Sequence, residues 1–128
     1  MPMKKYQPFK SELTKLGELA NTPDLIDQLQ AKETNQEITV YSDPDLGFLA
    51  VKPVTRANQL TLFVWVAISR LPNGIVTVLP MLEQMARETG CSAIEFETTR
   101  KGFKRVARNI GFVPIGQREI FTIYRKEV

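Results

Sequence analysis

Histidine is absent from the 128 residues of this chain, and cysteine occurs once, at Cys91. Without histidine, the Ser-His-Asp and Cys-His triads and the histidine-containing zinc sites are excluded. A single cysteine excludes an internal disulfide, and its place at the start of an apolar segment predicts a packed thiol rather than a reactive one. Acid–base chemistry must therefore use carboxylates, Lys, Tyr, Cys or ordered water, and no metal site is expected.

Long apolar runs are also missing. No segment approaches the roughly 18 consecutive apolar residues of a membrane span, and the start of the chain lacks the apolar run of a signal peptide. We therefore expect no membrane association and a cytoplasmic location. Because 43% of the residues are hydrophobic and no linker or low-complexity tract interrupts the chain, we expect residues 1–128 to form a single domain around one core.

Two short helices are predicted before the first strand. The spacing of apolar residues in residues 8–20 indicates an amphipathic helix. A second helix is expected from Thr22, which can serve as the N-cap, with Pro23 at the first helical position. Its buried stripe would consist of Leu25, Ile26 and Leu29.

Three strands follow. Residues 37–41 alternate polar and apolar side chains, residues 42–45 form a turn, and residues 47–52 pair back as the next strand. Residues 59–69 are the most apolar segment of the chain. A nearly continuous apolar run of this kind is typical of a central strand buried on both faces, which predicts helices on both sides of the sheet.

The next helix is predicted in the segment before Gly90, which is a natural helix stop. Pro80 cannot lie deep in a helix without removing a hydrogen bond and clashing with the preceding turn. We therefore expect the helix to begin near Thr77, with Thr77 as its cap and Pro80 in its first turn. The apolar residues at helical spacing are Val78, Leu79, Leu82, Met85 and Ala86.

The last third of the chain is its most informative part. Residues 91–99 have the pattern of a strand, residues 100–110 that of a basic amphipathic helix, Gly111-Phe112 that of a stop, and residues 113–126 that of a closing hairpin. The whole order is thus helix, helix, three antiparallel strands, helix, strand, helix and two strands. It predicts an α/β (α+β) fold with a mixed, mainly antiparallel sheet and helices on both faces.

Over residues 37–126 this order resembles the GNAT superfamily of acyl-CoA N-acyltransferases, in which a strand, a helix and a Gly-Phe pair lead into the final hairpin. The resemblance implies binding of acetyl-CoA or another acyl-CoA and transfer of the acyl group to an amine. It also implies that the strand at residues 60–68 splays from residues 92–97, because in GNAT sheets the gap between these strands admits the pantetheine arm of CoA.

The loop after the central strand carries the family's phosphate-binding pattern in degenerate form. GNAT proteins have Gln or Arg, two residues, Gly, one residue, then Gly or Ala, and backbone amides at the following helix N-terminus hold the CoA pyrophosphate. Here Asn73 and Ile75 replace the two small residues, and Gly74 is out of register by one. The resemblance assigns cofactor binding to Arg70, Asn73, Gly74 and Ile75. The alternative is a plain strand-to-helix connection.

The family's general acid is missing from its usual position. Many GNAT proteins carry Leu-Tyr before the Gly-Phe pair, and this tyrosine protonates the departing CoA thiolate. Counting back from Gly111-Phe112, the corresponding residues are Val106 and Ala107. Tyr124 in the last strand is a candidate substitute, and the alternative is that it is an ordinary residue of the sheet.

Glu95 and Glu97 are the candidates for the general base. Their spacing of two residues places both carboxylates on one face of a strand, with Ile94 and Phe96 on the other. Two carboxylates that share a partly buried face can activate a water molecule. The alternative is structural: each carboxylate pairs with an arginine or lysine of a neighbouring element.

Positive charge is concentrated in residues 100–126, which contain eight basic residues and one acidic residue. Four of the cations recur at steps of three and four, so they would form one stripe of the helix opposite an apolar, core-facing side. Such a stripe can bind CoA phosphates, nucleic acid or an acidic protein surface, or it can be a solvated face. Nucleic acid is disfavoured, because Trp65 lies in the most apolar strand and few other aromatics remain for base stacking. The stripe consists of Lys101, Lys104, Arg105 and Arg108. The apolar side consists of Phe103, Val106, Ala107 and Ile110.

Two functions remain open. The first is an acyl-CoA-dependent N-acyltransferase with weak or lost catalysis, acting on an amine acceptor. The second is a non-catalytic interaction protein on the same scaffold, with a protein partner. Small GNAT-like proteins of bacteriophages, some of them virion components, are similar in layout and length, which would place the protein in a virion instead of the cytoplasm.

Overall fold

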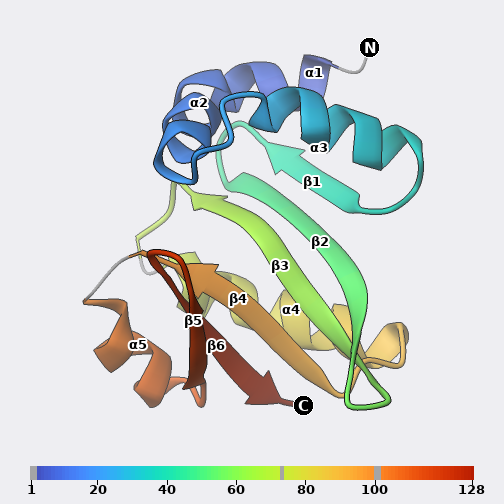
Figure 1. Cartoon of the computed structure of the whole chain (residues 1–128), viewed down its shortest axis with the longest axis vertical. Coiled ribbons are helices and arrows are strands. Elements are labelled where there is room, and N and C mark those ends of the chain that lie inside the picture. The colour runs from blue at the N-terminus through green and yellow to red at the C-terminus, as the bar shows by residue number, and fades with distance from the viewer. Residues whose placement is uncertain (1–2, 73, 100–101) are drawn as a thin grey trace. The chain divides into compact units, whose positions relative to one another are not determined.

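The computed structural model describes residues 3–72, 74–99 and 102–128. Its elements are, in chain order, α1 (Met3–Tyr6), a 3-10 turn η1 (Gln7–Phe9), α2 (Lys10–Leu19), α3 (Leu25–Thr34), β1 (Thr39–Asp43), β2 (Gly47–Arg56), β3 (Gln59–Ser69), α4 (Gly74–Glu88), β4 (Ala93–Thr98), α5 (Phe103–Asn109), β5 (Val113–Arg118) and β6 (Phe121–Glu127) (Figure 1). Apart from the added α1 and η1 at the start, this is the order that the sequence predicts.

The strands belong to one six-stranded sheet with the order β1-β2-β3-β4-β6-β5. β1 pairs with β2, and β6 pairs with both β4 and β5, in the antiparallel sense, whereas β3 and β4 are parallel. β6 is the last strand of the chain but lies between β4 and β5. The fold is therefore the mixed, mainly antiparallel α/β fold expected from the sequence.

The chain divides into two units. Unit 1 contains Met1–Lys52 and Val66–Pro72, and unit 2 contains Pro53–Trp65 and Asn73–Val128. Strands β2 and β3 contribute residues to both. The helices α1, α2 and α3 belong to unit 1, and α4 and α5 belong to unit 2.

The core of unit 1 is built around Phe48 of β2. The ring centroids of Tyr6 and Phe9 lie 5.6 and 5.7 Å from that of Phe48. Gly17 permits the close approach of α2 to the chain that leads into α3, because a Cβ at this position would lie 2.5 Å from the carbonyl oxygen of Thr22 and 3.1 Å from the Cβ of Leu25. The two helices contribute the buried side chains of Leu13, Leu25 and Leu29.

The expected N-cap of α3 is wrong. The helix begins at Leu25, and Asp24 rather than Thr22 occupies the N-cap position, without a side-chain hydrogen bond. The Thr22 hydroxyl instead donates a hydrogen bond at 3.2 Å to the carbonyl oxygen of Ala20, which is the C-cap residue of α2. Of the expected apolar stripe of α3, Leu25 and Leu29 are buried and Ile26 is half-buried.

The expected start of α4 near Thr77 is also wrong, because α4 begins at Gly74 and contains Pro80 in its interior. Pro80 has no N–H to donate to the carbonyl oxygen of Val76, one turn earlier. Both residues are exposed, so water can bind this carbonyl oxygen in place of the missing N–H. The proline is tolerated because the lost hydrogen bond falls on the solvent side of the helix.

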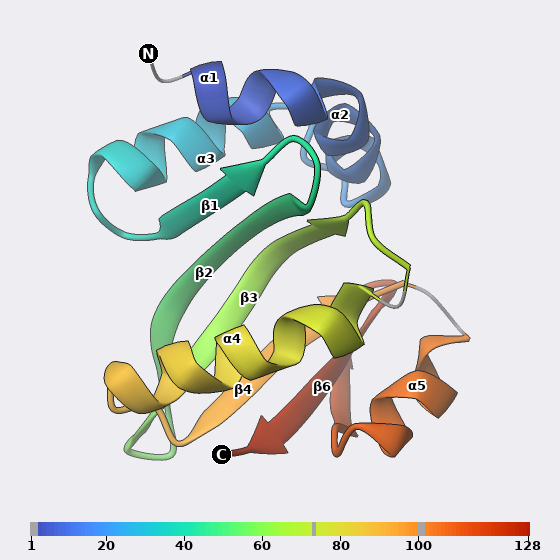
Figure 2. The same ribbon diagram turned by 180° about the vertical axis from the view of Figure 1, so that it is seen from behind.

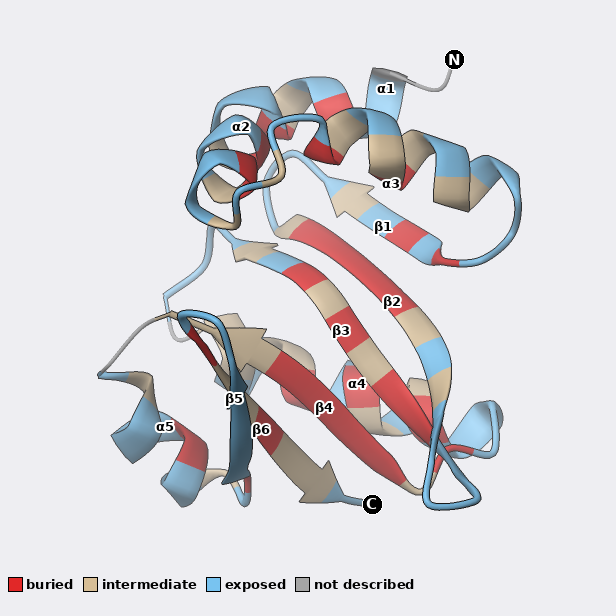
Figure 3. Ribbon diagram, viewed as in Figure 1, coloured by how far each residue is buried: buried red, intermediate tan, exposed pale blue. Residues whose placement is uncertain are grey.

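The core of unit 2 contains an aromatic cluster centred on Phe96 of β4. The ring centroid of Phe96 lies 5.0 Å from that of Phe103, 4.9 Å from that of Phe112 and 5.5 Å from that of Tyr124. α4 packs against β4 (Figure 2). Buried residues follow one another along most of β4, whereas β5 is exposed along its whole length (Figure 3).

The Gly-Phe pair ends α5 as predicted. Gly111 has a φ of +90°, a conformation that glycine adopts far more readily than other residues. The N–H of Phe112 then donates to the carbonyl oxygen of Ala107 at 2.9 Å, which closes the helix end. Phe112 is thereby turned into the aromatic cluster and is 1% exposed.

The pairing of β3 with β4 is short. It joins Thr61–Val64 to Ala93–Phe96, whereas β4 pairs with β6 along all of its residues as far as Thr98. The ladder between β3 and β4 therefore does not extend along the whole of both strands, which agrees with the expected splaying. Among the described residues, no helix has the length and apolar character needed to cross a bilayer.

Candidate active site

Glu95 lies at the centre of a charged cluster on one face of the unit 2 sheet. It stands directly opposite Arg125 in the antiparallel register of β4 and β6, and it is 1% exposed. Arg125 Nη1 donates to Glu95 Oε2 at 2.5 Å and to the hydroxyl of Thr61 at 3.0 Å. Arg56 Nε donates to the other carboxylate oxygen, Oε1, at 3.3 Å. Both oxygens of Glu95 thus accept hydrogen bonds from arginines.

Glu97 is held in a similar way by a single arginine. Arg118 of β5 donates from Nε to Glu97 Oε2 at 3.0 Å and from Nη2 to Oε1, so the contact is bidentate. Only 8% of the Glu97 side chain is exposed, compared with 53% of the Arg118 side chain. The hydrogen bond to Glu97 raises the pKa of the Arg118 guanidinium above its ordinary value.

We call Arg56, Arg118 and Arg125 the sheet arginines. Burial works against the charge of Arg125, but hydrogen bonds to Glu127 and Glu95 outweigh it and raise the pKa of this guanidinium. Glu95 and Glu97 share a face, as predicted, and both take arginine partners, which is the structural alternative. A water molecule or amine that is to lose a proton to either carboxylate must compete with these N–H donors. A catalytic role for the two residues stays a prediction.

Tyr124 lies on the other face of the sheet. Its ring is 3% exposed, stacks on Phe96 and meets the ring of Phe103 edge-on at 5.6 Å. No described residue hydrogen-bonds its hydroxyl, and no fully buried side-chain oxygen in the described ranges lacks a partner. The hydroxyl must therefore reach solvent at the border of the aromatic cluster. The structure brings Glu95 and Glu97 together but does not bring Tyr124 to them.

Ala107, the residue that the resemblance aligns with the tyrosine of many GNAT proteins, is fully buried. It lies on α5, one turn after Phe103, whose ring belongs to the aromatic cluster. Its methyl group supplies no proton.

The residues assigned to the phosphate loop fall in different parts of the structure. Gly74 and Ile75 open α4 in unit 2, and Asn73 lies outside the described residues. Arg70 belongs to unit 1, where its guanidinium lies 4.1 Å over the ring of Phe9. It donates to the carboxylate of Glu12 at 2.9 Å and also to the carbonyl oxygens of Pro8 and Pro44.

The basic stripe is described from residue 102 onward, so Lys101 lies outside the described residues. Lys104, Arg105 and Arg108 are exposed, and we call them the cationic face of α5. On the opposite side Ala107 is buried and Phe103 is half-buried, as expected. Val106 was expected on the core side, but it is 37% exposed because it lies at the border between the two sides.

Sequence reasoning did not identify the sheet arginines as the partners of the two glutamates, or Thr61 as a second acceptor for Arg125. The alternation of β4 indicated that the glutamates share a face, but their partners come from β2, β5 and β6. In the described part of the chain, no three Cys, Asp or Glu side chains are grouped so that they could hold a metal ion.

No protein-family model matches the sequence, and a comparison with curated proteins gives no match. Solved structures do match. A GNAT-family acetyltransferase from Listeria monocytogenes is 9% identical in sequence, with a TM-score of 0.67. The match covers 100% of this chain and 91% of the Listeria chain. Aminoglycoside 6'-acetyltransferase type Ii is 15% identical, with a TM-score of 0.66, and the match covers 98% of this chain and 90% of the acetyltransferase chain.

A third structure is the PaiA N-acetyltransferase of Thermoplasma acidophilum in complex with coenzyme A. It is 15% identical, with a TM-score of 0.58, and the match covers 98% of this chain and 85% of the PaiA chain. These likenesses extend over nearly the whole chain and agree with the element order and the sheet described above. The chain therefore has the fold of the GNAT acetyltransferases.

Proposed function

We propose that this protein binds an acyl-CoA and transfers the acyl group to an amine slowly, or has lost the transfer step. The observation that carries this proposal is the engagement of Glu95 and Glu97 with the sheet arginines on a GNAT fold. The structure of PaiA, which has the same fold, contains coenzyme A. Cofactor binding is thus proposed from the fold, and weak catalysis from the residues.

The start of α4 is the proposed pyrophosphate site. Since α4 begins at Gly74, the amides of Gly74 and Ile75 belong to its first turn, where N–H groups have no partner within the helix. These groups and the helix dipole favour an anion. Arg70, which the resemblance also assigns to the cofactor, is engaged within unit 1 by Glu12 and by the carbonyl oxygens of Pro8 and Pro44, so the proposed site consists of the amides of Gly74 and Ile75. When bound, acyl-CoA supplies the activated thioester.

Proton transfer is the step that we propose to be impaired. The ammonium group of the acceptor must lose a proton before it attacks, but all four carboxylate oxygens of Glu95 and Glu97 accept arginine N–H groups. The thiolate must gain a proton as it leaves, but Ala107 has none to give. Loss of one positioned acid or base reduces the rate by a factor of roughly 10²–10⁴.

Tyr124 is the proposed remaining proton donor. It stands opposite Phe96, the last residue of β4 that pairs with β3. Its hydroxyl has no hydrogen-bond partner among the described residues, so it is free to donate. The packed rings of Phe96 and Phe103 hold it in a fixed orientation.

Calorimetric titration with acetyl-CoA tests cofactor binding. We expect the wild-type protein to bind and Gly74→Asp to lose binding, because a carboxylate in the first turn suits the helix but repels a pyrophosphate. Met81→Asp is the matched control, since it adds the same charge to an exposed position farther along α4. A wild-type protein that does not bind, or equal binding by both variants, would contradict the proposed site.

Thiol release with a panel of amines tests the transfer step. We expect slow turnover, and a further decrease in kcat for Tyr124→Phe with acetyl-CoA affinity unchanged. Ala107→Tyr is not expected to restore the rate, because Ala107 is fully buried and offers no room for a larger ring. Rapid turnover that Tyr124→Phe leaves unchanged would show that catalysis is intact and uses another proton donor.

A non-catalytic interaction protein is the second candidate, and it includes the phage-type and virion proteins considered from the sequence. The observation that favours it is the exposed cationic face of α5, which no described acidic residue neutralises. Failure to bind both acetyl-CoA and free CoA would favour this candidate over the first.

A further inference from the structure

The cationic face of α5 has no role in the proposed acyl transfer. None of its three side chains forms an ion pair with a carboxylate within residues 3–72, 74–99 and 102–128. By contrast, each of the sheet arginines in the same unit pairs with a glutamate. The positive charge of α5 is therefore left uncompensated by the part of the chain that the structure describes.

The charge pattern in the first turn of α5 is unfavourable to the helix itself. Its N-cap position has no side-chain hydrogen bond, and its first turn contains no acidic residue. Lys104 lies in that first turn, where the helix dipole disfavours a cation. Lys104 and Arg108 are four residues apart, so their like charges repel each other on one side of the helix. An anionic partner would relieve both effects.

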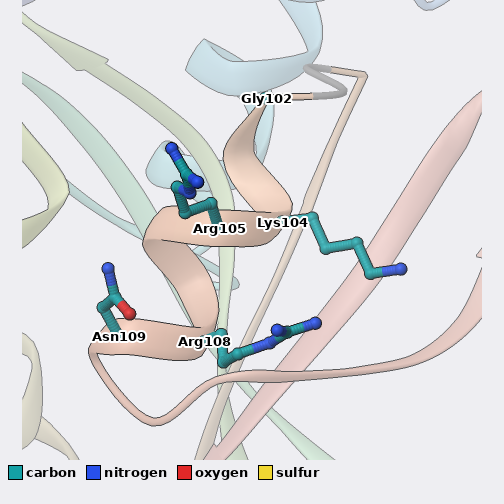
Figure 4. A pocket seen from close by; sticks show the side chains of 5 residues that line it. All are labelled: Gly102, Lys104, Arg105, Arg108 and Asn109. Atoms are coloured by element: carbon teal, nitrogen blue, oxygen red, sulfur yellow. The ribbon is translucent and has the colours of Figure 1, made fainter.

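A hollow of about 440 Å³ lies over this face, lined by Gly102, Asn109 and the three cations. Lys104 and Arg108 project to one side of the helix, and Arg105 and Asn109 to the other (Figure 4). The two rows can thus hold acidic groups on both sides of the helix. Asn109 adds an amide that can both donate and accept a hydrogen bond.

The surroundings of the cations favour a protein as the occupant. Val106, on the same helix, is 37% exposed, and an apolar residue beside a charged rim is typical of protein interfaces. The aromatic ring of α5, that of Phe103, packs against Phe96 and Tyr124 and is not free to stack on a base. A two-fold contact between copies of this chain would place the cations opposite one another.

We propose that the cationic face of α5 is a docking surface for an acidic segment of a partner protein. Carboxylates of that segment pair with Lys104, Arg105 and Arg108, and one of its apolar side chains covers Val106. This interaction does not depend on acyl-CoA, so it can be correct whether or not the proposed acyl transfer is.

Fluorescence anisotropy with a labelled 15-residue peptide of alternating glutamate and leucine tests the proposal. We expect the wild-type protein to bind the peptide, and binding to weaken as salt is added. Lys104→Glu/Arg108→Glu should reduce affinity by about tenfold or more, because two attractive contacts become repulsive. Val106→Gln should weaken binding less and leave its salt dependence unchanged.

Two controls separate the proposed surface from general attraction between charges. Lys10→Glu/Lys15→Glu changes the net charge by the same amount on exposed residues of α2, and we expect it to bind the peptide as the wild type does. A peptide with glutamine in place of glutamate should not bind. If the double reversal on α5 does not fold, as judged by circular dichroism, the single variant Arg105→Glu provides the test.

Four outcomes would overturn the proposal. One is that neither the protein nor its variants bind the acidic peptide at millimolar concentration. Another is that the glutamine peptide binds equally well. A third is that the control on α2 loses as much affinity as the reversal on α5. The last is that a 15-nucleotide single strand of thymidine binds more tightly and displaces the peptide, which would make this a nucleic-acid surface.

Discussion

Two groups of cations in unit 2 have opposite environments. The sheet arginines come from β2, β5 and β6, and each meets a glutamate of β4. The cationic face of α5 meets no carboxylate among the described residues and is exposed. Residues of the same type therefore stabilise the fold in one place and remain available for a partner in the other.

The difference follows from burial. A carboxylate removed from water, such as Glu95, must be paired and hydrogen-bonded, because an isolated buried charge is strongly unfavourable. A cation on a solvent-exposed helix keeps its hydration and needs no partner. The buried glutamates of β4 thus need arginine partners, whereas the cations of α5 compensate no buried charge among the described residues.

Removing Arg125 should have the largest effect on stability. Arg125→Met leaves the carboxylate of Glu95, which is 1% exposed, without its shortest hydrogen bond. Breaking a buried ion pair from one side destabilises a protein by about 3–5 kcal/mol. Urea denaturation of Arg125→Met beside Arg108→Met, which removes an exposed cation, measures the contrast. Equal free energies of unfolding for the two variants would show that the Glu95 cluster does not support the fold.

A smaller loss is expected at Arg118, because more than half of its side chain is exposed. Arg118→Met should reduce the free energy of unfolding by about 1 kcal/mol, as for a well-aligned pair near the surface. The same change frees both oxygens of Glu97. If Glu97 can act as the general base, thiol release by this variant should increase, and an unchanged rate would argue against that role.

The elements of the fold could be predicted from the sequence because their signals are local. The alternation of polar and apolar side chains predicted the first strand, the continuous apolar run predicted β3, and Gly111 predicted the end of α5. The start of α4 was predicted wrongly because of Pro80. The rule that proline is excluded from helix interiors does not consider whether the carbonyl group that loses its hydrogen bond, here that of Val76, is exposed to solvent. The position of that carbonyl depends on which side of α4 packs inward.

The partners of the glutamates could not be predicted because they depend on the order of strands. Glu95 lies 30 residues before Arg125, and the two meet because β6 inserts between β4 and β5. No local pattern specifies that insertion. The alternation of β4 placed the two carboxylates on one face, and that part of the site was correct.

An ion pair in unit 1 adds a test by pH. Burial raises the pKa of Glu33, but hydrogen bonds from Lys5 and Tyr6 outweigh it and hold the pKa below its ordinary value. The ionised form is thus favoured by folding, so its contribution is present above the unfolded pKa of about 4.3 and is lost as the pH falls through the lower folded value.

Glu33→Gln should therefore be less stable than the wild type at neutral pH, and the difference should shrink as the pH falls below about 4. Thermal unfolding across this range measures the difference between the two proteins. A constant difference at every pH would mean that the lost hydrogen bonds matter and the charge does not. Lys32→Gln, which removes a charge of the same helix from the longer ion pair with Glu37, serves as the control.

The smallest change in stability is expected on α5. Lys104→Glu places an acidic residue in the first turn, where the helix dipole favours it, and Arg108→Glu places one in the last turn, where the dipole disfavours it. The two effects are of similar size and opposite sign, and exposed charges contribute only about 0–1 kcal/mol each. The double variant should therefore unfold at nearly the same urea concentration as the wild type. If it unfolds much earlier, the cations of α5 stabilise the fold as the sheet arginines do, and the contrast between the two groups is wrong.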